Sequence, residues 1–216
     1  MTENALARKM FLVLHDPFSG KALAPPKLIR YAVGTAGLAD LVLQGRLAVN
    51  GARITAVGGW RDGGRPGVHA VLVGEVGPAG GDITRSWVER VGDAAYAQVA
   101  HELVAARVIR REVRGGLLRR GVEERFPAVD LLGAAGPRVQ LEHMLCSPHD
   151  MDVVGATIAA ILDSLRLDAA LDFDCDRDVA RRAAAAAARG LPDGVRDLVT
   201  EVGKAVIEVT LTFRRL

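Results

Sequence analysis

The sequence has only two cysteines, no long apolar run and few aromatic residues. Cys146 and Cys175 are too few for the disulfide framework that stabilises small secreted domains. No apolar run approaches the roughly 20 residues of a membrane-spanning helix, and the apolar stretch 10–14 is too short for the core of a signal peptide. We therefore expect a protein of the reducing cytoplasm that reaches a membrane only by docking on its surface.

The chain also lacks an excess of charge and a catalytic motif. Its 28 Lys and Arg residues nearly balance its 26 Asp and Glu residues, which leaves a net charge of +2. Any electrostatic function must therefore come from where the charges lie. There is no G-x-S-x-G, no P-loop and no convincing Ser/His/Asp set. We expect neither enzymatic activity nor a cofactor.

One segment has the residue types of a metal site without its spacing. His143, Cys146, His149 and Asp152 offer imidazole, thiolate and carboxylate groups, which are zinc ligands. Pro148 interrupts the helix that would align them, and their order matches no zinc pattern. We interpret the segment as a loop that leads into the next helix, and we expect no metal site.

The most informative segment is an apolar helix followed by a glycine. Over residues 27–44 apolar side chains fall on all faces, which is typical of a helix buried in a core. Two prolines precede the segment, where they suit a first helical turn. Gly45 tolerates the left-handed conformation that ends many helices, and a short hairpin with a turn at Asn50-Gly51 is expected after it.

Amphipathic stripes of apolar residues predict two further helices, at 151–166 and 195–209, and the chain length suits one core. We expect a mainly α, single-domain helical bundle with a central buried helix and one or two β-hairpins. Residues 1–8 are predicted to be a flexible N-terminal segment and residues 9–216 the domain. Helices are also expected at 68–76 and 177–189.

Positive charge is concentrated between Arg107 and Arg125, where seven arginines face three glutamates. Gly115-Gly116 predicts the tip of a hairpin over residues 108–126. Arginines beside two leucines suit a surface of phosphate and hydrocarbon, so we predict a membrane or oligomer contact. A solvated hairpin with its leucines turned to the core is an equally open interpretation. The predicted contact residues are Arg110, Arg111, Arg114, Leu117, Leu118 and Arg119.

The ordered set of these segments resembles the Golgi phosphoprotein 3 family, in the form of a bacterial, actinobacterial-type member. The resemblance covers the chain from about Lys9 onward, and it rests on the order of the segments rather than on any single motif. It implies a Golgi phosphoprotein 3-like helical fold and a peripheral membrane adaptor. Eukaryotic relatives bind phosphatidylinositol 4-phosphate and gather the cytoplasmic tails of glycosyltransferases. The matching residues are Leu38, Asp40, Leu41, Leu43, Gly45, Arg46 and Leu47.

The headgroup pocket that the resemblance implies is not retained residue by residue. Its tryptophan falls on Pro25, its arginine on Gly34, and its two later basic residues on Asp93 and Tyr96. Cations one helical turn away could replace the lost arginine and the first of the later basic residues. Our hypothesis is a displaced anionic-headgroup site, with the competing interpretation that its members are unrelated surface cations. Its members are Lys27, Arg30 and Arg90.

The sequence therefore favours a non-enzymatic adaptor at an anionic membrane surface, cytoplasmic and peripheral on the inner face of the cell membrane. Its partners would be an anionic phospholipid or phosphoinositide headgroup and an unknown protein client. The first alternative is a soluble protein-binding scaffold that forms a homo-oligomer through the 108–126 hairpin. A winged-helix nucleic-acid binder, with helix 94–107 and wing 108–126, is third because the helix presents few groups to base edges.

Overall fold

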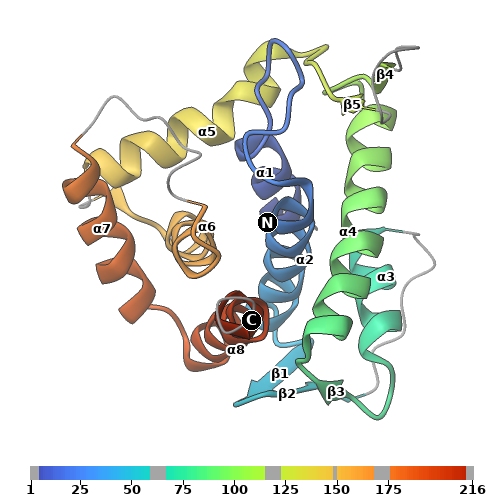
Figure 1. Ribbon diagram of the computed structural model, residues 1–216, viewed down its shortest axis with the longest axis vertical. Helices are drawn as coiled ribbons and strands as arrows, with labels where there is room; N and C mark the ends of the chain where they lie inside the picture. Colours follow the sequence, from blue (N-terminus) through green and yellow to red (C-terminus); the bar gives the residue numbers. More distant parts are fainter. Residues whose placement is uncertain (1–4, 59–66, 115–122, 148–149, 168–175, 213–216) are drawn as a thin grey trace.

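The computed structural model describes residues 5–58, 67–114, 123–147, 150–167 and 176–212 as a mainly helical domain (Figure 1). A three-stranded antiparallel sheet and a separate two-stranded hairpin accompany the helices. The elements are α1 (Ala5–Val13), α2 (Pro26–Leu43), β1 (Leu47–Asn50), β2 (Arg53–Ala56), α3 (Val68–Val76), β3 (Gly81–Asp82), α4 (Arg85–Ala105), β4 (Glu112–Arg114), β5 (Glu123–Arg125), α5 (Leu131–Cys146), α6 (Val153–Ser164), α7 (Arg177–Arg189) and α8 (Asp193–Thr212).

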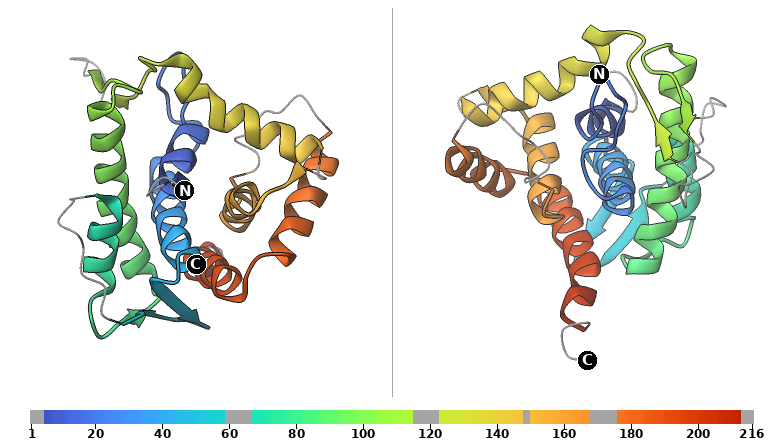
Figure 2. Two further views of the ribbon diagram at one scale, coloured as in Figure 1. Left: turned by 180° about the vertical axis from the view of Figure 1, so that it is seen from behind. Right: turned by 45° about the horizontal axis from the view of Figure 1, so that its top comes forward.

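Helix α2 is the central helix that the sequence predicts. Every residue from Tyr31 to Asp40 is buried, and α2 contacts α1, α3, α4, α6 and α8. Figures 1 and 2 show α3 and α4 on one side of it and α6, α7 and α8 on the other. The expected mainly α bundle with a buried central helix is thus confirmed.

The two ends of α2 follow from the residues there. Pro26 occupies the first helical position, where a missing N–H costs nothing. At the other end Gly45 has φ +68°, and its N–H donates to the Val42 carbonyl oxygen. The Arg46 N–H donates to the Leu41 carbonyl oxygen, so both bonds of a Schellman motif are present. The glycine end predicted from the sequence is confirmed.

Helices α2 and α4 approach each other so closely that their backbones meet at two glycines. A Cβ placed on Gly34 would lie 2.9 Å from the Gly92 Cα, and one placed on Gly92 would lie 2.9 Å from the Arg30 carbonyl oxygen. Real Cβ atoms do not approach backbone atoms this closely, so neither position accepts a side chain without a shift of a helix. Gly34 and Gly92 are therefore packing residues of the contact between α2 and α4.

The β-structure is slightly more extensive than expected. Strands β1 and β2 pair in antiparallel register, with Asn50 opposite Arg53, so the turn residues are Gly51 and Ala52. The sequence did not predict β3, whose two residues add a third strand beside β2. In the second hairpin β4 pairs with β5, and its predicted tip at Gly115-Gly116 lies outside the described residues.

The expected outer helices are present with small changes of boundary. Helices α3 and α7 have the predicted bounds, whereas α6 is shorter than the predicted 151–166. Asp152 caps α6 by accepting the Gly155 N–H at 2.6 Å. Helix α8 (Asp193–Thr212) extends beyond the predicted 195–209 at both ends.

Two features differ from the sequence expectations. Helix α1 begins at Ala5, ahead of the expected domain start at residue 9, and Leu6 is buried in the core.

Cys146 at the end of α5 is disulfide-bonded, and Cys175 lies outside the described residues. One such bond is far from a multi-bridge framework, but it does not support the expected reducing compartment. Among the described helices, none is long and apolar enough to cross a bilayer.

The glycine contact between α2 and α4 makes a direct prediction about stability. Gly34→Ala should lower the free energy of unfolding by about 1–3 kcal/mol, because the added methyl group overpacks a backbone contact. Gly74→Ala is the matched control, since Gly74 also lies within a helix but a Cβ there meets nothing within 4 Å. It should raise stability by about 0.5–1 kcal/mol. Urea unfolding measures both, and equal effects would contradict the packing account.

Candidate functional site

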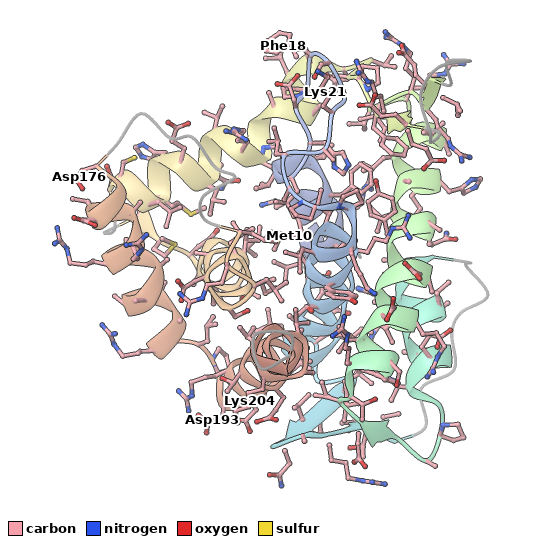
Figure 3. The ribbon with its side chains drawn as sticks, viewed as in Figure 1. Met10, Phe18, Lys21, Asp176, Asp193 and Lys204 are labelled. Carbon is pink, nitrogen blue, oxygen red and sulfur yellow. The ribbon has the colours of Figure 1, made fainter. Side chains whose placement is uncertain are left out.

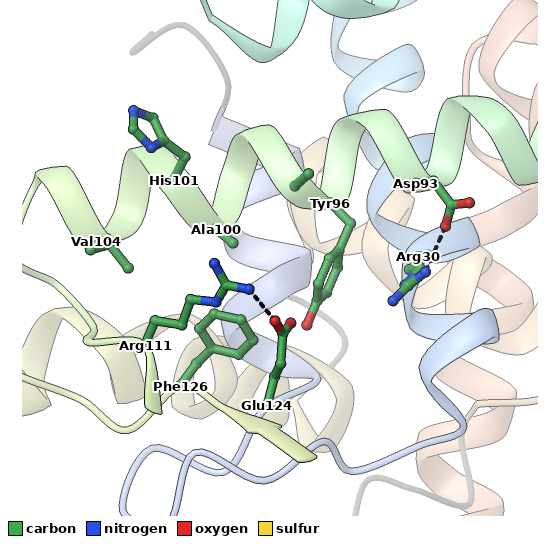
Figure 4. Close-up of a pocket in the computed structure, with 10 residues that line it drawn as sticks. Arg30, Asp93, Tyr96, Ala100, His101, Val104, Arg111, Glu124 and Phe126 are labelled. Atoms are coloured by element: carbon green, nitrogen blue, oxygen red, sulfur yellow. Dashed lines mark hydrogen bonds and ion pairs between the residues drawn. The ribbon is translucent and has the colours of Figure 1, made fainter. Parts of the chain in front are cut away.

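A pocket of about 380 Å³ lies beside α4, between this helix, the hairpin β4–β5 and the first turns of α2 (Figure 4). Two arginines, two carboxylates and two aromatic rings supply most of its chemistry. The lining residues are Arg30, Asp93, Tyr96, Ala97, Ala100, His101, Val104, Arg111, Glu124 and Phe126.

One end of the pocket is formed by Arg30 of α2 against two residues of α4. The Arg30 Nη1 donates to the Asp93 Oδ1 at 2.9 Å. The guanidinium carbon lies 5.6 Å from the centroid of the Tyr96 ring, a distance suited to a cation–π contact. The close glycine approach of α2 and α4 brings these three side chains together, and the two contacts fix the direction of the guanidinium.

The other end of the pocket is formed by the hairpin. Arg111, just before β4, pairs with Glu124 of β5, and the Phe126 side chain lies beside them (Figure 4). The Arg111 and Glu124 side chains are 60% and 36% exposed, and those of Arg30 and Asp93 are 42% and 52% exposed. Both ion pairs are therefore open to solvent, and such pairs are typically worth about 0–1 kcal/mol. An incoming anion could exchange with either carboxylate at low cost.

A buried aromatic cluster supports the pocket from behind. Phe11 of α1 stacks on His15 with ring centroids 4.2 Å apart, and Phe126 meets Phe11, His15 and Tyr96 edge-on. The His15 Nδ1 lies 2.7 Å from the Phe11 carbonyl oxygen, which can only accept, so this nitrogen carries the proton. The Nε2 is then free to accept the Tyr96 hydroxyl at 3.2 Å. These contacts hold the Tyr96 ring in place beneath Arg30.

Burial sets the protonation of both polar members of this cluster. Burial lowers the pKa of His15 from 6.5 to about 4, against a smaller opposing effect of its hydrogen bond to Phe11. Burial also raises the pKa of the Tyr96 phenol. At neutral pH the ring of His15 is therefore uncharged and the Tyr96 hydroxyl keeps its proton, so the floor of the pocket carries no charge.

The predicted trio of Lys27, Arg30 and Arg90 does not converge on this pocket. Arg30 lines it, but Lys27 pairs with Glu89 of α4, and that hydrogen bond raises the pKa of Lys27. The Arg90 Nε donates to the Glu75 Oε2 of α3 at 2.6 Å. The structure instead brings Arg30 together with Arg111, which sequence analysis assigned to the separate hairpin contact.

The other predicted hairpin residues are not among those that line the pocket, and three of them lie outside the described chain. The Arg110 Nε donates to the Glu112 Oε1 at 2.9 Å, and the backbone of Arg114 pairs with that of Glu123 in the hairpin. Leu117, Leu118 and Arg119 lie outside the described residues.

Among the lining residues that sequence reasoning missed, Glu124 and Phe126 add a charge and an aromatic ring to the pocket. In the sequence, Glu124 is visible only as one of the three glutamates within the arginine-rich stretch from Arg107 to Arg125. Aromatic residues make up only 4% of the chain, so each one stands out in the sequence. The position of Phe126 directly after the hairpin is the one sequence signal for its role in the pocket. Nothing in the sequence spacing could show that it would meet Tyr96.

Three of the four positions that the family resemblance assigns to a headgroup lie on α2 and α4, at Gly34, Asp93 and Tyr96. Gly34 faces the backbone of α4, where an arginine side chain has no room. Asp93 and Tyr96 stand on α4 where the family resemblance implies basic residues, and both line the pocket. Arg30 lies one turn before Gly34 and reaches both of them. Two of the four positions, Asp93 and Tyr96, therefore line the pocket, and Arg30 contacts both of them.

The chemistry available in the pocket is recognition by charge and stacking. Two guanidinium groups can each present paired N–H donors to a phosphate or carboxylate. Within the described part of the chain, no group of three or more His, Cys, Asp or Glu residues is placed to hold a metal ion.

Comparison with known proteins gives one strong result. The family model of Golgi phosphoprotein 3 (GPP34) matches residues 6–202, which is most of the chain. A search of curated proteins found no match.

The buried His15 makes stability depend on pH in a defined window. Because its pKa is lower in the folded than in the unfolded chain, the unfolded chain takes up a proton first as the pH falls below 6.5. Since one pKa unit corresponds to about 1.4 kcal/mol, this group should cost roughly 3 kcal/mol of stability between pH 7 and pH 4. The loss levels off below about pH 4, where the folded chain also binds the proton.

The measurement is urea unfolding of the wild type and His15→Leu across this range of pH. The variant should lose about 3 kcal/mol less than the wild type between pH 7 and pH 4, because it has no imidazole to protonate. His101→Leu is the control, since His101 is exposed and should leave the pH dependence unchanged. Parallel curves for His15→Leu and the wild type would show that burial of His15 does not produce the effect.

Proposed function

Because the chain belongs to the Golgi phosphoprotein 3 family, we propose that it is a non-enzymatic peripheral membrane adaptor whose pocket beside α4 binds the phosphate of an anionic lipid headgroup. The family resemblance implies an adaptor without catalytic activity that binds phosphatidylinositol 4-phosphate, as its eukaryotic relatives do. A phosphoinositide is therefore the first headgroup to test here.

The observation that carries the proposal is the meeting of Arg30 and Arg111 in one pocket. One comes from the central helix and the other from the hairpin, so only the folded chain brings them together. Arginine is the side chain best suited to grip a phosphate, because its planar fork donates two parallel hydrogen bonds. The cation–π contact with the Tyr96 ring orients the Arg30 guanidinium group for this contact with phosphate.

The carboxylates of the pocket set the strength and selectivity of binding. Asp93 and Glu124 neutralise the two arginines in the free protein, so the pocket has no net formal charge. A phosphate must displace these carboxylates from the guanidinium groups and then lie close to them. We therefore expect weaker binding than in a pocket of unopposed cations, and a loss of binding as salt rises.

The client of such an adaptor would be a protein at the same membrane surface, and the proposed location is the inner face of the cell membrane. The scaffold alternative, with oligomers formed through the 108–126 hairpin, predicts no dependence on lipid or salt. The nucleic-acid alternative has less support, since the helix it would use, α4, packs on α1, α2, α3 and α8.

Loss of the two pocket arginines should reduce membrane binding. The double variant Arg30→Ala/Arg111→Ala should bind vesicles containing phosphatidylinositol 4-phosphate at least about tenfold more weakly than the wild type, because each charge-assisted contact to phosphate is worth about 1.5–3 kcal/mol. Vesicle co-sedimentation at low and physiological salt is the measurement, with vesicles of neutral lipid and of phosphatidylinositol alongside.

The matched control is Arg53→Ala/Arg181→Ala, which removes two exposed, ion-paired arginines elsewhere. It changes net charge equally and should bind nearly as the wild type does. Equal losses in both double variants would reduce the effect to overall charge and refute a specific pocket.

Removal of a competing carboxylate should have the opposite effect. Asp93→Asn should strengthen binding to the same vesicles by severalfold, because it frees Arg30 and removes a negative charge that faces the phosphate. Asp82→Asn is the control, since Asp82 pairs with Arg53 on the small sheet and should change binding little. Vesicle titration of the three proteins measures the difference. Weaker binding by Asp93→Asn would mean that the carboxylate supports the site.

A further inference from the structure

Exposed large apolar side chains are concentrated at one end of the molecule. Phe18 is 75% exposed and Leu132 is 88% exposed, and Val129 and Leu131 are 55% and 44% exposed. We call these four residues the apolar rim. Single exposed apolar residues are ordinary, whereas a contiguous group is a mark of an interaction surface.

Backbone hydrogen bonds join the two segments that carry the rim residues. The Ala128 N–H donates to the Pro17 carbonyl oxygen at 2.9 Å, and the Phe126 N–H donates to the Gly20 carbonyl oxygen at 2.9 Å. Figure 3 shows Phe18 at the end of the molecule where α5 begins. The loop after α1 therefore lies directly against the chain that leads into α5.

Phe18 is held in a fixed turn. The Asp16 Oδ1 accepts the Ser19 N–H and the Ser19 hydroxyl, each at 2.6 Å. The Gly20 N–H donates to the Asp16 carbonyl oxygen at 2.8 Å. Burial raises the pKa of Asp16, but the hydrogen bonds from Ser19 and Phe18 and the charge of Arg138 outweigh it, so the pKa lies below its ordinary value. The Asp16 carboxylate is therefore ionised at neutral pH and keeps its hydrogen bonds to Ser19. The Phe18 ring in this turn stays exposed to solvent.

Two cations without a carboxylate partner in the described residues flank the rim. Lys21 follows the Phe18 turn, and its exposed side chain lies at the same end (Figure 3). Arg107 is exposed at the end of α4, next to Val108, whose carbonyl oxygen accepts the Val129 N–H at 2.9 Å. The nearby Asp130 carboxylate is engaged by the Gly133 N–H at 3.1 Å.

We infer that the apolar rim inserts into the interface of an anionic lipid membrane, with Phe18 and Leu132 among the acyl chains and Lys21 and Arg107 at the level of the headgroups. The charge pattern favours this occupant, because exposed apolar groups beside cations match a surface of hydrocarbon and phosphate. The inference rests on the proposed membrane function and adds to it the end of the molecule that enters the membrane. It also places the rim next to the pocket, since Phe126 lines the pocket and its backbone anchors the Phe18 loop.

The first test reports insertion directly. Phe18→Trp is mixed with vesicles of phosphatidylglycerol and phosphatidylcholine, and its fluorescence is corrected for that of the unsubstituted chain. Insertion shifts the emission to the blue, and brominated acyl chains quench it. Val57→Trp is the control, because Val57 is also exposed but follows β2 at the opposite end of the molecule (Figure 1). It should show neither change.

The second test measures the contribution of the rim to affinity. Phe18→Ser/Leu132→Ser should bind the same vesicles at least about tenfold more weakly, because burial of large apolar side chains drives insertion. Val57→Ser/Val153→Ser removes two exposed apolar residues elsewhere and should bind as the wild type does. Gel filtration of each variant, without lipid, shows whether the rim instead holds two copies of the chain together.

The outcomes separate the two proposals. One outcome is that the wild type binds vesicles while the emission of the tryptophan introduced by Phe18→Trp is neither shifted nor quenched. This result would overturn insertion of the rim and leave the proposed binding pocket standing. Unchanged vesicle binding by the serine variant, with loss of a dimer, would make the rim a protein interface and also overturn the inference. No binding of the wild type to any anionic vesicle, phosphoinositide included, would overturn both proposals.

Discussion

The close approach of α2 and α4 at Gly34 and Gly92 is the constraint on which the rest of the structure depends. It is possible only because neither residue has a side chain, and it brings the central helix within backbone contact of its longest neighbour. Helix α2 can then be buried along most of its length between two groups of helices. The same contact decides which side chains of the two helices meet at the surface, and these include the pocket residues Arg30, Asp93 and Tyr96.

This constraint explains how the pocket can differ from the one the family resemblance implies. A glycine that packs against the α4 backbone cannot be an arginine, so a cation in this region must come from another turn of α2. Arg30 is one turn away, and the hairpin adds Arg111 from the other side. Each arginine has a carboxylate partner in the free protein. In the function we propose, an anion would therefore replace a carboxylate at each guanidinium group instead of entering a pocket of unopposed cations.

Local sequence signals predicted the elements well, and pairing across the fold could not be predicted from them. The ends of α2 follow from Pro26 and Gly45, and the start of α7 follows from its capping residue Asp176. The meeting of Arg30 with Arg111 depends on how α4 and the hairpin pack, which no spacing reveals. Helical spacing groups Lys27 and Arg90 with Arg30 in the sequence. In the structure each of the two forms an ion pair with a carboxylate on a neighbouring helix.

The central claim is that Arg30 and Arg111 together contact a phosphate. It is tested most directly by NMR of the arginine side-chain Nε–H signals during titration with a short-chain, water-soluble phosphatidylinositol 4-phosphate. The account predicts that the signals of Arg30 and Arg111 shift together with one saturation curve, while that of Arg53, paired with Asp82 on the small sheet, stays in place. Shifts spread over all exposed arginines, or none at Arg30 and Arg111, would contradict it.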